Sequence, residues 1–353
     1  MKNKLGLALA IFIVLSLSAC ANATPAASAS GLSGELNVFV WTEYMPDTVF
    51  QKFTEETGVK TNVSTYSTNE DLLAKVKASN AGIYDIVVPS DYMVKMMIAE
   101  GLLEPLDKPK ITNLQNIGQG YLNPSFDPGN VYSVPYMSGV AALVIDTEKV
   151  AEDITSFSQI LDPAYANSIV ALDDPRAVIG AVSKSLGYSL NTVDPTELAQ
   201  TDVKLALLKP NIKLLDSDSP KSAMLSGEAS IGYMWNAEIA ICLEESDRFK
   251  AVFPEEGCYL FLDNLCVLKG AKNSANANEF INFILRPDVS KLVSDEYPYT
   301  NPNAAAVELL PESYKDNPAS NVDPAIFTKG EYVADLPASE LERYDDLWTR
   351  FVK

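Results

Sequence analysis

The feature that most constrains the fold is a regular alternation of short β-rich runs with helical patterns, which begins at residue 35. "ELNVFV" at 35–40 predicts a strand, and the next pattern predicts a helix from Asp47 that stops at Gly58. The strand "VKTNV", a helix from Asn69 to Ser79 and the buried strand "YDIVVPS" follow. This β, α, β, α, β order predicts a parallel α/β architecture.

A second series of the same kind begins near residue 140. It comprises the strand "VAALVID", the strand "NSIVALDD", a helix over about 176–186, the strands "EASIGYMW" and "FLDNLCVLKGA", and one long amphipathic helix over 275–294. A chain of 353 residues with 47% hydrophobic content can form two domains, each with its own core. We therefore expect two α/β units.

The first twenty residues predict an export signal. Lys2 and Lys4 precede an apolar run from Leu5 to Leu17, which is too short to be interpreted first as a membrane span. The ending "LSAC" resembles the lipobox of bacterial lipoproteins, which implies that Cys20 is acylated and anchors the protein at the outer face of the cytoplasmic membrane or in the periplasm. Residues 21–33 are small and polar, as in a flexible tether. The alternative is a disordered leader without lipid.

The charge and the missing residue types exclude several functions. There are 47 acidic against 27 basic residues, a net charge of −20, so nucleic acid is not an expected partner and a cation is the natural guest. The chain has no histidine, which removes His-based triads and His zinc sites. After Cys20 there remain Cys242, Cys258 and Cys266, without a metal-like cluster. Whether two of them pair stays open.

Chemically distinctive side chains follow the apolar runs, where ligands bind in open α/β sheets. Both halves of the chain contribute aromatic rings and carboxylates, as a cleft for an ammonium compound requires. "WTEY" alone also fits a packing corner or a sugar site, and Asp173 with Asp174 fits an acid and base pair. Adjacent strand residues point to opposite faces, however, so one of these two aspartates is expected to cap the helix after Pro175. The strand-end residues are Trp41, Glu43, Tyr44, Ser90, Tyr92, Asp173, Asp174, Trp235, Phe261 and Asp263.

Seven segments in order, "FVWTEYMP", "YDIVVPSDYMV", "LDDPRAV", "IGYMWNAE", "LDNL", "FILRPDVSK" and "YTNPNAA", resemble the extracellular polyamine-binding proteins of bacterial spermidine/putrescine ABC transporters. The resemblance covers essentially the whole mature chain. It implies the two-lobe periplasmic-binding-protein fold of type II, with a hinged cleft between lobes. The expected lobes are 34–139 with 262–306, and 140–261 with 307–353. It further implies a polyamine ligand, a membrane permease as partner, a monomer, no cofactor and no catalysis.

The resemblance also implies which residues contact the ligand. Carried over by motif, they are Trp41, Thr42, Glu43, Tyr44, Ser90, Tyr92, Asp174, Ser217, Trp235, Phe261, Asp263 and Tyr299. Two departures concern specificity. Spermidine-type members have Glu where this chain has Ala177, whereas Glu238 and Phe261 match the putrescine type. Glu238 therefore joins the expected contacts, unless it is a solvated first-turn helix residue, and putrescine stands beside spermidine as the expected ligand.

Other functions stay open at this point. A different cation is possible for a binding protein of this kind, although a basic amino acid would need an arginine for its carboxylate, with Arg176 as the nearby candidate. A surface glycosidase or lyase would use Asp174 and Glu238 as acid and base. A sensing role without transport is a further alternative.

Overall fold

The computed structural model describes residues 32–79 and 82–353. The export signal, Cys20 and residues 21–31 of the expected tether lie outside the described residues. Within the described ranges, no helix combines the length and the apolar character that crossing a bilayer demands.

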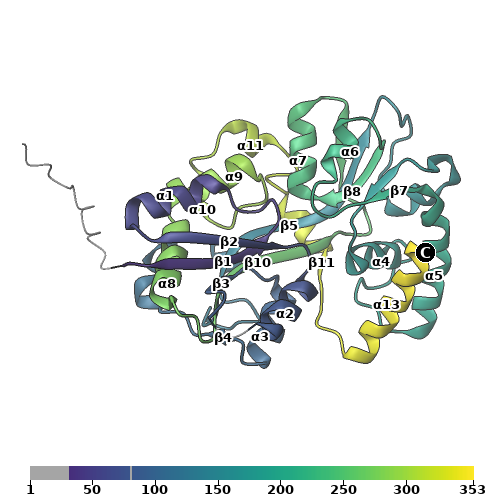
Figure 1. The fold of residues 1–353 in the computed structure, drawn as a ribbon. Coiled ribbons are helices and arrows are strands. Elements are labelled where there is room, and N and C mark those ends of the chain that lie inside the picture. Colours follow the sequence, from purple (N-terminus) through teal and green to yellow (C-terminus); the bar gives the residue numbers. More distant parts are fainter. Residues whose placement is uncertain (1–31, 80–81) are drawn as a thin grey trace, which may run out of the picture.

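One mixed sheet extends through the molecule (Figure 1). Its strands are β1 (Glu35–Trp41), β2 (Lys60–Tyr66), β3 (Ile86–Val87), β4 (Leu103–Glu104), β5 (Ser133–Asp146), β6 (Ile169–Ala171), β7 (Ile212–Leu215), β8 (Ile231–Trp235), β9 (Phe249–Val252), β10 (Tyr259–Leu268) and β11 (Glu331–Tyr332). The main path follows the order β2-β1-β3-β10-β5-β8-β6-β7. β1 pairs in parallel with β2 and β3, and β6 pairs in parallel with β7 and β8. Each half therefore has the expected parallel α/β arrangement.

Helices cover the sheet in both halves (Figure 1). They are α1 (Asp47–Thr57), α2 (Asn69–Ala78), α3 (Asp91–Ala99), α4 (Pro175–Lys184), α5 (Pro195–Leu208), α6 (Lys221–Leu225), α7 (Asn236–Glu245), α8 (Ser274–Ile284), α9 (Pro287–Glu296), α10 (Ala304–Val307), α11 (Glu312–Asp316), α12 (Pro324–Lys329) and α13 (Ala338–Val352). Short 3₁₀ helices occupy Lys108–Lys110, Thr112–Asn116, Gln119–Tyr121, Phe157–Leu161, Pro163–Tyr165 and Lys209–Asn211. The predicted stop of α1 is confirmed, because Gly58 adopts φ 76° and its N–H bonds to the carbonyl of Thr54.

The prediction of one helix over 275–294 is wrong. The segment forms two helices, α8 and α9, which are separated at Leu285 and Arg286. Arg286 has extended backbone angles (φ −63°, ψ 137°) and precedes Pro287, the first residue of α9. The proline ring disfavours the helical conformation in the residue before it, so the chain breaks there although the apolar periodicity continues.

The two halves are joined by β5 and β10, which pair antiparallel with each other in the middle of the sheet. β10 pairs with β3 and β4 of the first half, whereas β5 pairs with β8 and β9 of the second. Every residue of β5 and β10 is buried. Near the crossing Gly139 lies opposite Phe261, and a Cβ added at Gly139 would lie 2.0 Å from Asn236 Oδ1 and 2.7 Å from the Phe261 ring. Glycine is therefore required for the close approach of these two side chains to β5.

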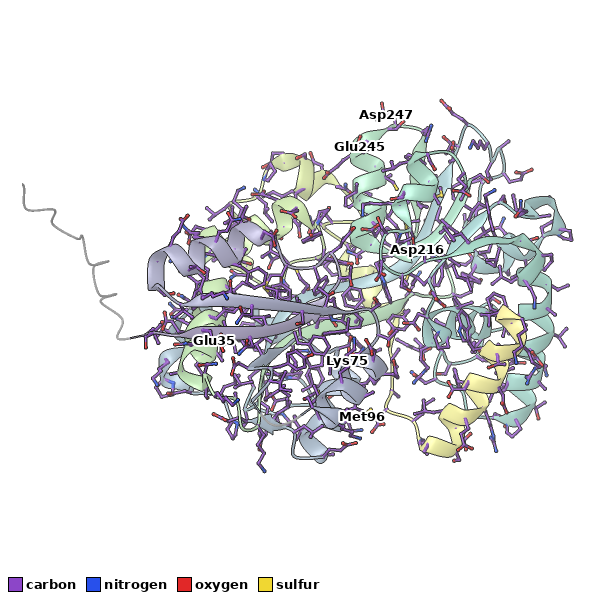
Figure 2. The ribbon with its side chains drawn as sticks, viewed as in Figure 1. Glu35, Lys75, Met96, Asp216, Glu245 and Asp247 are labelled. Atoms are coloured by element: carbon purple, nitrogen blue, oxygen red, sulfur yellow. The ribbon has the colours of Figure 1, made fainter. Side chains whose placement is uncertain are left out.

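The acidic excess is partly a solvated surface. Glu35, Glu245 and Asp247 are exposed, and Figure 2 shows the latter two at the outer end of α7.

The three cysteines of the described chain, Cys242, Cys258 and Cys266, are buried free thiols. Burial raises the pKa of the first two to about 12, so they are unreactive at neutral pH.

Candidate ligand-binding cleft

A single cavity brings together residues from strand ends of both halves and from the first part of β10. The prediction that Phe261 and Asp263 follow a strand is wrong, because the strand continues to Leu268. Every ligand contact that the sequence predicts lines it: Trp41, Thr42, Glu43, Tyr44, Ser90, Tyr92, Asp174, Ser217, Trp235, Glu238, Phe261, Asp263 and Tyr299. Asp173, the exposed neighbour of Asp174, is not among the lining residues. The two aspartates are thus separated as expected, although both lie beyond β6, which ends at Ala171, so strand alternation is not the cause. That these residues contact a ligand stays a prediction.

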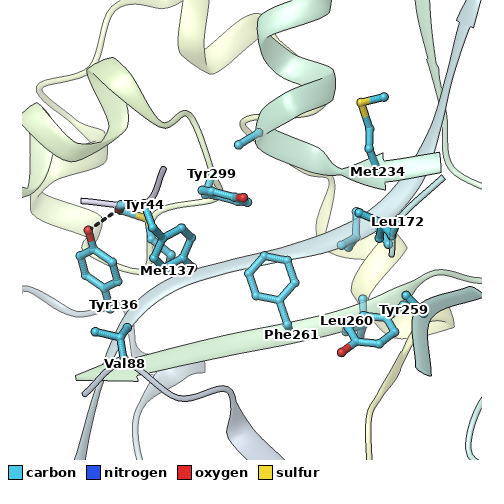
Figure 3. Packing of buried hydrophobic residues seen from close by; sticks show 14 of the residues in the cluster. Tyr44, Val88, Tyr136, Met137, Leu172, Met234, Tyr259, Leu260, Phe261 and Tyr299 are labelled. Carbon is cyan, nitrogen blue, oxygen red and sulfur yellow. Dashed lines mark hydrogen bonds between the residues drawn. The ribbon is translucent and has the colours of Figure 1, made fainter. Parts of the chain in front are cut away.

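An aromatic wall forms one side of the cavity. Tyr259 and Phe261 are alternate residues of β10, so both side chains emerge on the same face of the strand. The Trp235 ring contacts both, with centroids at 5.5 and 5.4 Å, and Phe261 is 5.8 Å from Tyr299, which is 5.0 Å from Tyr44. All four contacts are edge-on, and Figure 3 shows Tyr44, Tyr299, Phe261 and Tyr259 along this wall. A continuous π surface of this kind attracts cations.

A second aromatic pair belongs to the first half. Trp41 ends β1, and its indole Nε1 donates to the carbonyl of Val88 at 2.8 Å. The hydroxyl of Tyr66 donates to the same carbonyl at 2.7 Å, and the two ring centroids are 4.7 Å apart. The backbone therefore satisfies the polar groups of both rings.

Asp263 is the most distinctive carboxylate of the cavity. It is 4% exposed, and its two oxygens accept hydrogen bonds of 2.6 Å from the hydroxyls of Tyr44 and Ser90. Burial raises the pKa of Asp263 to about 7, although both hydrogen bonds lower it. No lysine or arginine of residues 32–79 and 82–353 forms an ion pair with it. The cavity thus holds a buried acid that a bound cation would compensate.

Asp174 is a second acid of the cavity, and it also begins α4. Its carboxylate accepts from the backbone N–H of Ala177 at 2.9 Å, which confirms the predicted helix cap. Burial raises the pKa of Asp174 to about 6, and the nearby carboxylate of Glu70 adds to the increase. Glu70 accepts a hydrogen bond of 2.9 Å from the Tyr92 hydroxyl. Asp174 and Glu70 together make this part of the cavity negative.

Glu238 is buried, at 5% exposed, so it is not the solvated helix residue that was the alternative. Its two carboxylate oxygens accept hydrogen bonds from Lys221 Nζ at 3.0 and 3.1 Å. The same ammonium group lies 2.8 Å from Glu43 Oε2. Burial raises the pKa of Glu238, and Lys221 opposes the increase. Sequence reasoning did not identify Lys221, which starts a short helix.

The structure adds further lining residues: Tyr66, Ser67, Asn69, Glu70, Asp218 and Tyr259. Two signals could have found some of them. Tyr66 ends β2, so the strand-end rule would have selected it had the strand been extended beyond Val63. Tyr259 precedes Phe261 by two residues and shares its strand face. Asn69 and Glu70 lie in the first turn of α2, and no strand-end pattern marks them.

Two α/β halves joined by crossing strands, with a cavity at the strand ends between them, define a solute-binding protein of the hinged two-lobe kind. Residues 48–322 match the family of bacterial extracellular solute-binding proteins, and the chain belongs to this family. The family and fold that the sequence predicted are thereby confirmed.

Similar proteins cover nearly the full chain. The spermidine/putrescine-binding periplasmic protein of Salmonella typhimurium is 38% identical over 95% of this chain and 97% of its own length. The substrate-binding protein PotD of the spermidine/putrescine ABC transporter of Streptococcus pneumoniae is 36% identical, with a TM-score of 0.78 over 90% of this chain and 98% of that one. The TpPotD lipoprotein of Treponema pallidum is 29% identical, with a TM-score of 0.79 over 90% and 99% of the two chains.

Proposed function

We propose that the protein binds a polyamine, putrescine or spermidine, in this cleft and delivers it to the membrane permease of an ABC importer. The observation that carries the proposal is the environment of Asp263. This buried carboxylate lies among aromatic rings, and its two hydrogen-bond donors are both neutral hydroxyls. The names of the relatives support the same ligand class.

The lining explains how an ammonium compound would bind. Each ring that faces a cation in a water-poor site contributes about 0.5 to 2 kcal/mol, and the aromatic wall offers several such faces. Asp263 and Asp174 provide negative charge at separate positions, and a flexible diamine can contact both. Ser217 Oγ is buried and has no hydrogen-bond partner within the described part of the chain, so it is a further contact for an amine N–H.

Closure of the two lobes would follow from contacts that only the closed form makes. Trp41 and Ser90 come from the first half, whereas Asp174 and Trp235 come from the second. We place the lobes at 34–139 with 262–306 and at 140–261 with 307–353, because β5 and β10 exchange their partners near Gly139. A ligand that bridges both lobes stabilises the closed state.

We further propose that the protein is exported, anchored by lipid on Cys20, monomeric and without catalytic activity. The lipobox-like "LSAC" supports the anchor, and the periplasmic relatives support export. The pairing of Glu238 with Lys221 argues against its use as a catalytic acid or base beside Asp174. Recovery of unchanged ligand after prolonged incubation with the protein would test the absence of catalysis.

Isothermal titration of the purified protein with putrescine and spermidine tests the proposal. The expected result is one-to-one binding with a micromolar or lower Kd that weakens as salt rises. Butylamine lacks one ammonium group of putrescine and 1,4-butanediol lacks both, so these two comparators should bind progressively more weakly. A folded protein that binds neither polyamine, or binds butanediol as well as putrescine, contradicts the proposal.

The chain offers a matched pair of variants. Asp174→Asn removes a cavity charge but retains an N-cap residue, so α4 should persist. Asp173→Asn removes the same charge one residue away, outside the cavity. Only Asp174→Asn should weaken putrescine binding, by tenfold or more. Equal effects of the two variants would indicate that general surface charge, rather than the cleft, governs affinity.

A further inference from the structure

We propose that Lys221 is a specificity-determining residue: its ammonium group pairs with Glu43 and Glu238, which line one end of the cleft, and thereby favours a diamine over a longer triamine. The inference rests on the proposed function, because it concerns the choice between polyamines.

The position of Lys221 is defined by several contacts. Its Nζ lies 2.8 Å from Glu43, 3.0 and 3.1 Å from the oxygens of Glu238 and 3.0 Å from Ser219 Oγ. Its backbone N–H donates to Glu238 at 3.3 Å. The side chain of Lys221 is 17% exposed, and that of Glu238 is 7% exposed. The protein thus places its own cation where two carboxylates converge.

Glu43 contributes to this arrangement through an unusual backbone. It follows β1 with φ 49°, a left-handed conformation that non-glycine residues seldom adopt. Glu43 comes from the first half of the chain, whereas Lys221 and Glu238 come from the second. The ion pair between Lys221 and Glu43 therefore spans the cleft and contributes to closure with any ligand.

The charge of the cleft differs between its two ends. Burial raises the pKa of Tyr299, and Glu238, Asp263 and Glu43 raise it further. Burial also raises the pKa of Tyr259, to which Asp174, Asp91 and Glu70 add and which Arg176 opposes. The aromatic wall runs from Tyr44, the donor to Asp263, through Tyr299, Phe261 and Trp235 to Tyr259. Asp263 thus lies beside the Tyr44 end of this wall, and Asp174 acts on the ring at the Tyr259 end.

The distribution of countercharges then decides which ligand fits. Asp174, Glu70 and Asp263 form no ion pair with a lysine or arginine of the described residues, whereas Glu43 and Glu238 share Lys221. Arg176 lowers the pKa of Asp174 through space, but its guanidinium group donates to Asn191 and to the carbonyl of Ala334 rather than to Asp174. Two ammonium groups of a ligand can therefore be neutralised by Asp263 and by the Asp174 end. A third ammonium that reached Glu238 would lie beside Lys221, and two like charges in a partly buried site repel each other.

The test is the ratio of the Kd for spermidine to the Kd for putrescine, measured by calorimetry for wild type, Lys221→Met and Lys221→Arg. Because loss of the bridge to Glu43 affects closure around both ligands, that effect cancels in the ratio. Lys221→Met should lower the ratio at least tenfold, and Lys221→Arg, which keeps the charge, should leave it within about threefold of wild type. Adding Glu238→Gln to Lys221→Met should restore the ratio, since the freed carboxylate is removed.

A measurement on the wild type does not depend on how the variants fold. Monoacetylated spermidine has the spermidine skeleton but only two ammonium groups, so it should bind more tightly than spermidine. The inference would be overturned if the wild type bound spermidine more tightly than monoacetylated spermidine. It would also be overturned if folded Lys221→Met had the same ratio of Kd for spermidine to Kd for putrescine as the wild type. Either result would leave polyamine binding intact. Absence of binding by wild type to either amine would overturn the proposed function and this inference together.

Discussion

Acidification should weaken putrescine binding steeply, because the ligand requires ionised carboxylates in the cleft. Burial raises the pKa of Asp263 to about 7 and that of Asp174 to about 6 in the ligand-free protein. A bound ammonium group stabilises the ionised forms, so both pKa values must fall in the complex. When the pH is below these pKa values, putrescine binding therefore releases protons from the two carboxyl groups, and the affinity falls.

The magnitude follows from the fraction of each group that is ionised. At pH 5 a group with a pKa of about 7 is ionised in about 1% of molecules, so Asp263 alone costs about 100-fold in affinity relative to pH 8. Asp174 adds about tenfold over the same range. The product is about 1,000-fold, or about 4 kcal/mol. The ammonium groups of putrescine stay protonated throughout, so the ligand contributes no opposing change.

Calorimetric titrations from pH 5 to pH 8 measure this dependence directly. Repeating them near pH 6 in buffers with different ionisation enthalpies gives the number of protons released, expected to be about 1.4, of which Asp263 supplies about 0.9 and Asp174 about 0.5. Asp263→Asn should bind weakly but retain only the tenfold dependence of Asp174, and Asp173→Asn should behave like wild type. A wild-type Kd that changes less than threefold between pH 8 and pH 5 would refute the reasoning.

Three further predictions concern the residues that hold the cleft together. Asp263→Asn should raise the unfolding free energy of the ligand-free protein at pH 8 by about 1 to 3 kcal/mol, since a carboxyl group whose pKa is raised on folding destabilises the fold above that pKa. Urea unfolding should show the gain shrink towards pH 4, and a variant less stable than wild type at pH 8 would contradict this. Gly139→Ala should cost about 1 to 3 kcal/mol and weaken binding, because the new methyl group displaces both Asn236 and Phe261. Gly120→Ala, where a Cβ meets nothing within 4 Å, is the control, and equal effects of the two would be inconsistent with the packing argument. Tyr44→Phe removes the 2.6 Å hydrogen bond to Asp263, so the midpoint of the pH dependence of binding should rise, and an unshifted midpoint would count against a role for this bond.

The sequence by itself indicated the alternation of strands and helices in both halves and much of the cleft. Trp41 and Trp235 end β1 and β8 and line the cavity, because parallel strands bring their carboxyl ends to one edge of the sheet. The alternation of Phe261 and Asp263 along β10 fixes their common face in the same way. The break at Pro287 was also encoded locally, although the apolar periodicity obscured it.

The tertiary structure decided which charges are compensated. Lys221 lies 178 positions from Glu43 and 17 from Glu238, and no local periodicity relates the three residues. The pKa of Asp263 is likewise set by tertiary structure, since burial raises it and hydroxyls from two distant segments, Tyr44 and Ser90, lower it. Local patterns specify which side chain leaves which element, but the electrostatics of a buried site depend on every group that packs around it.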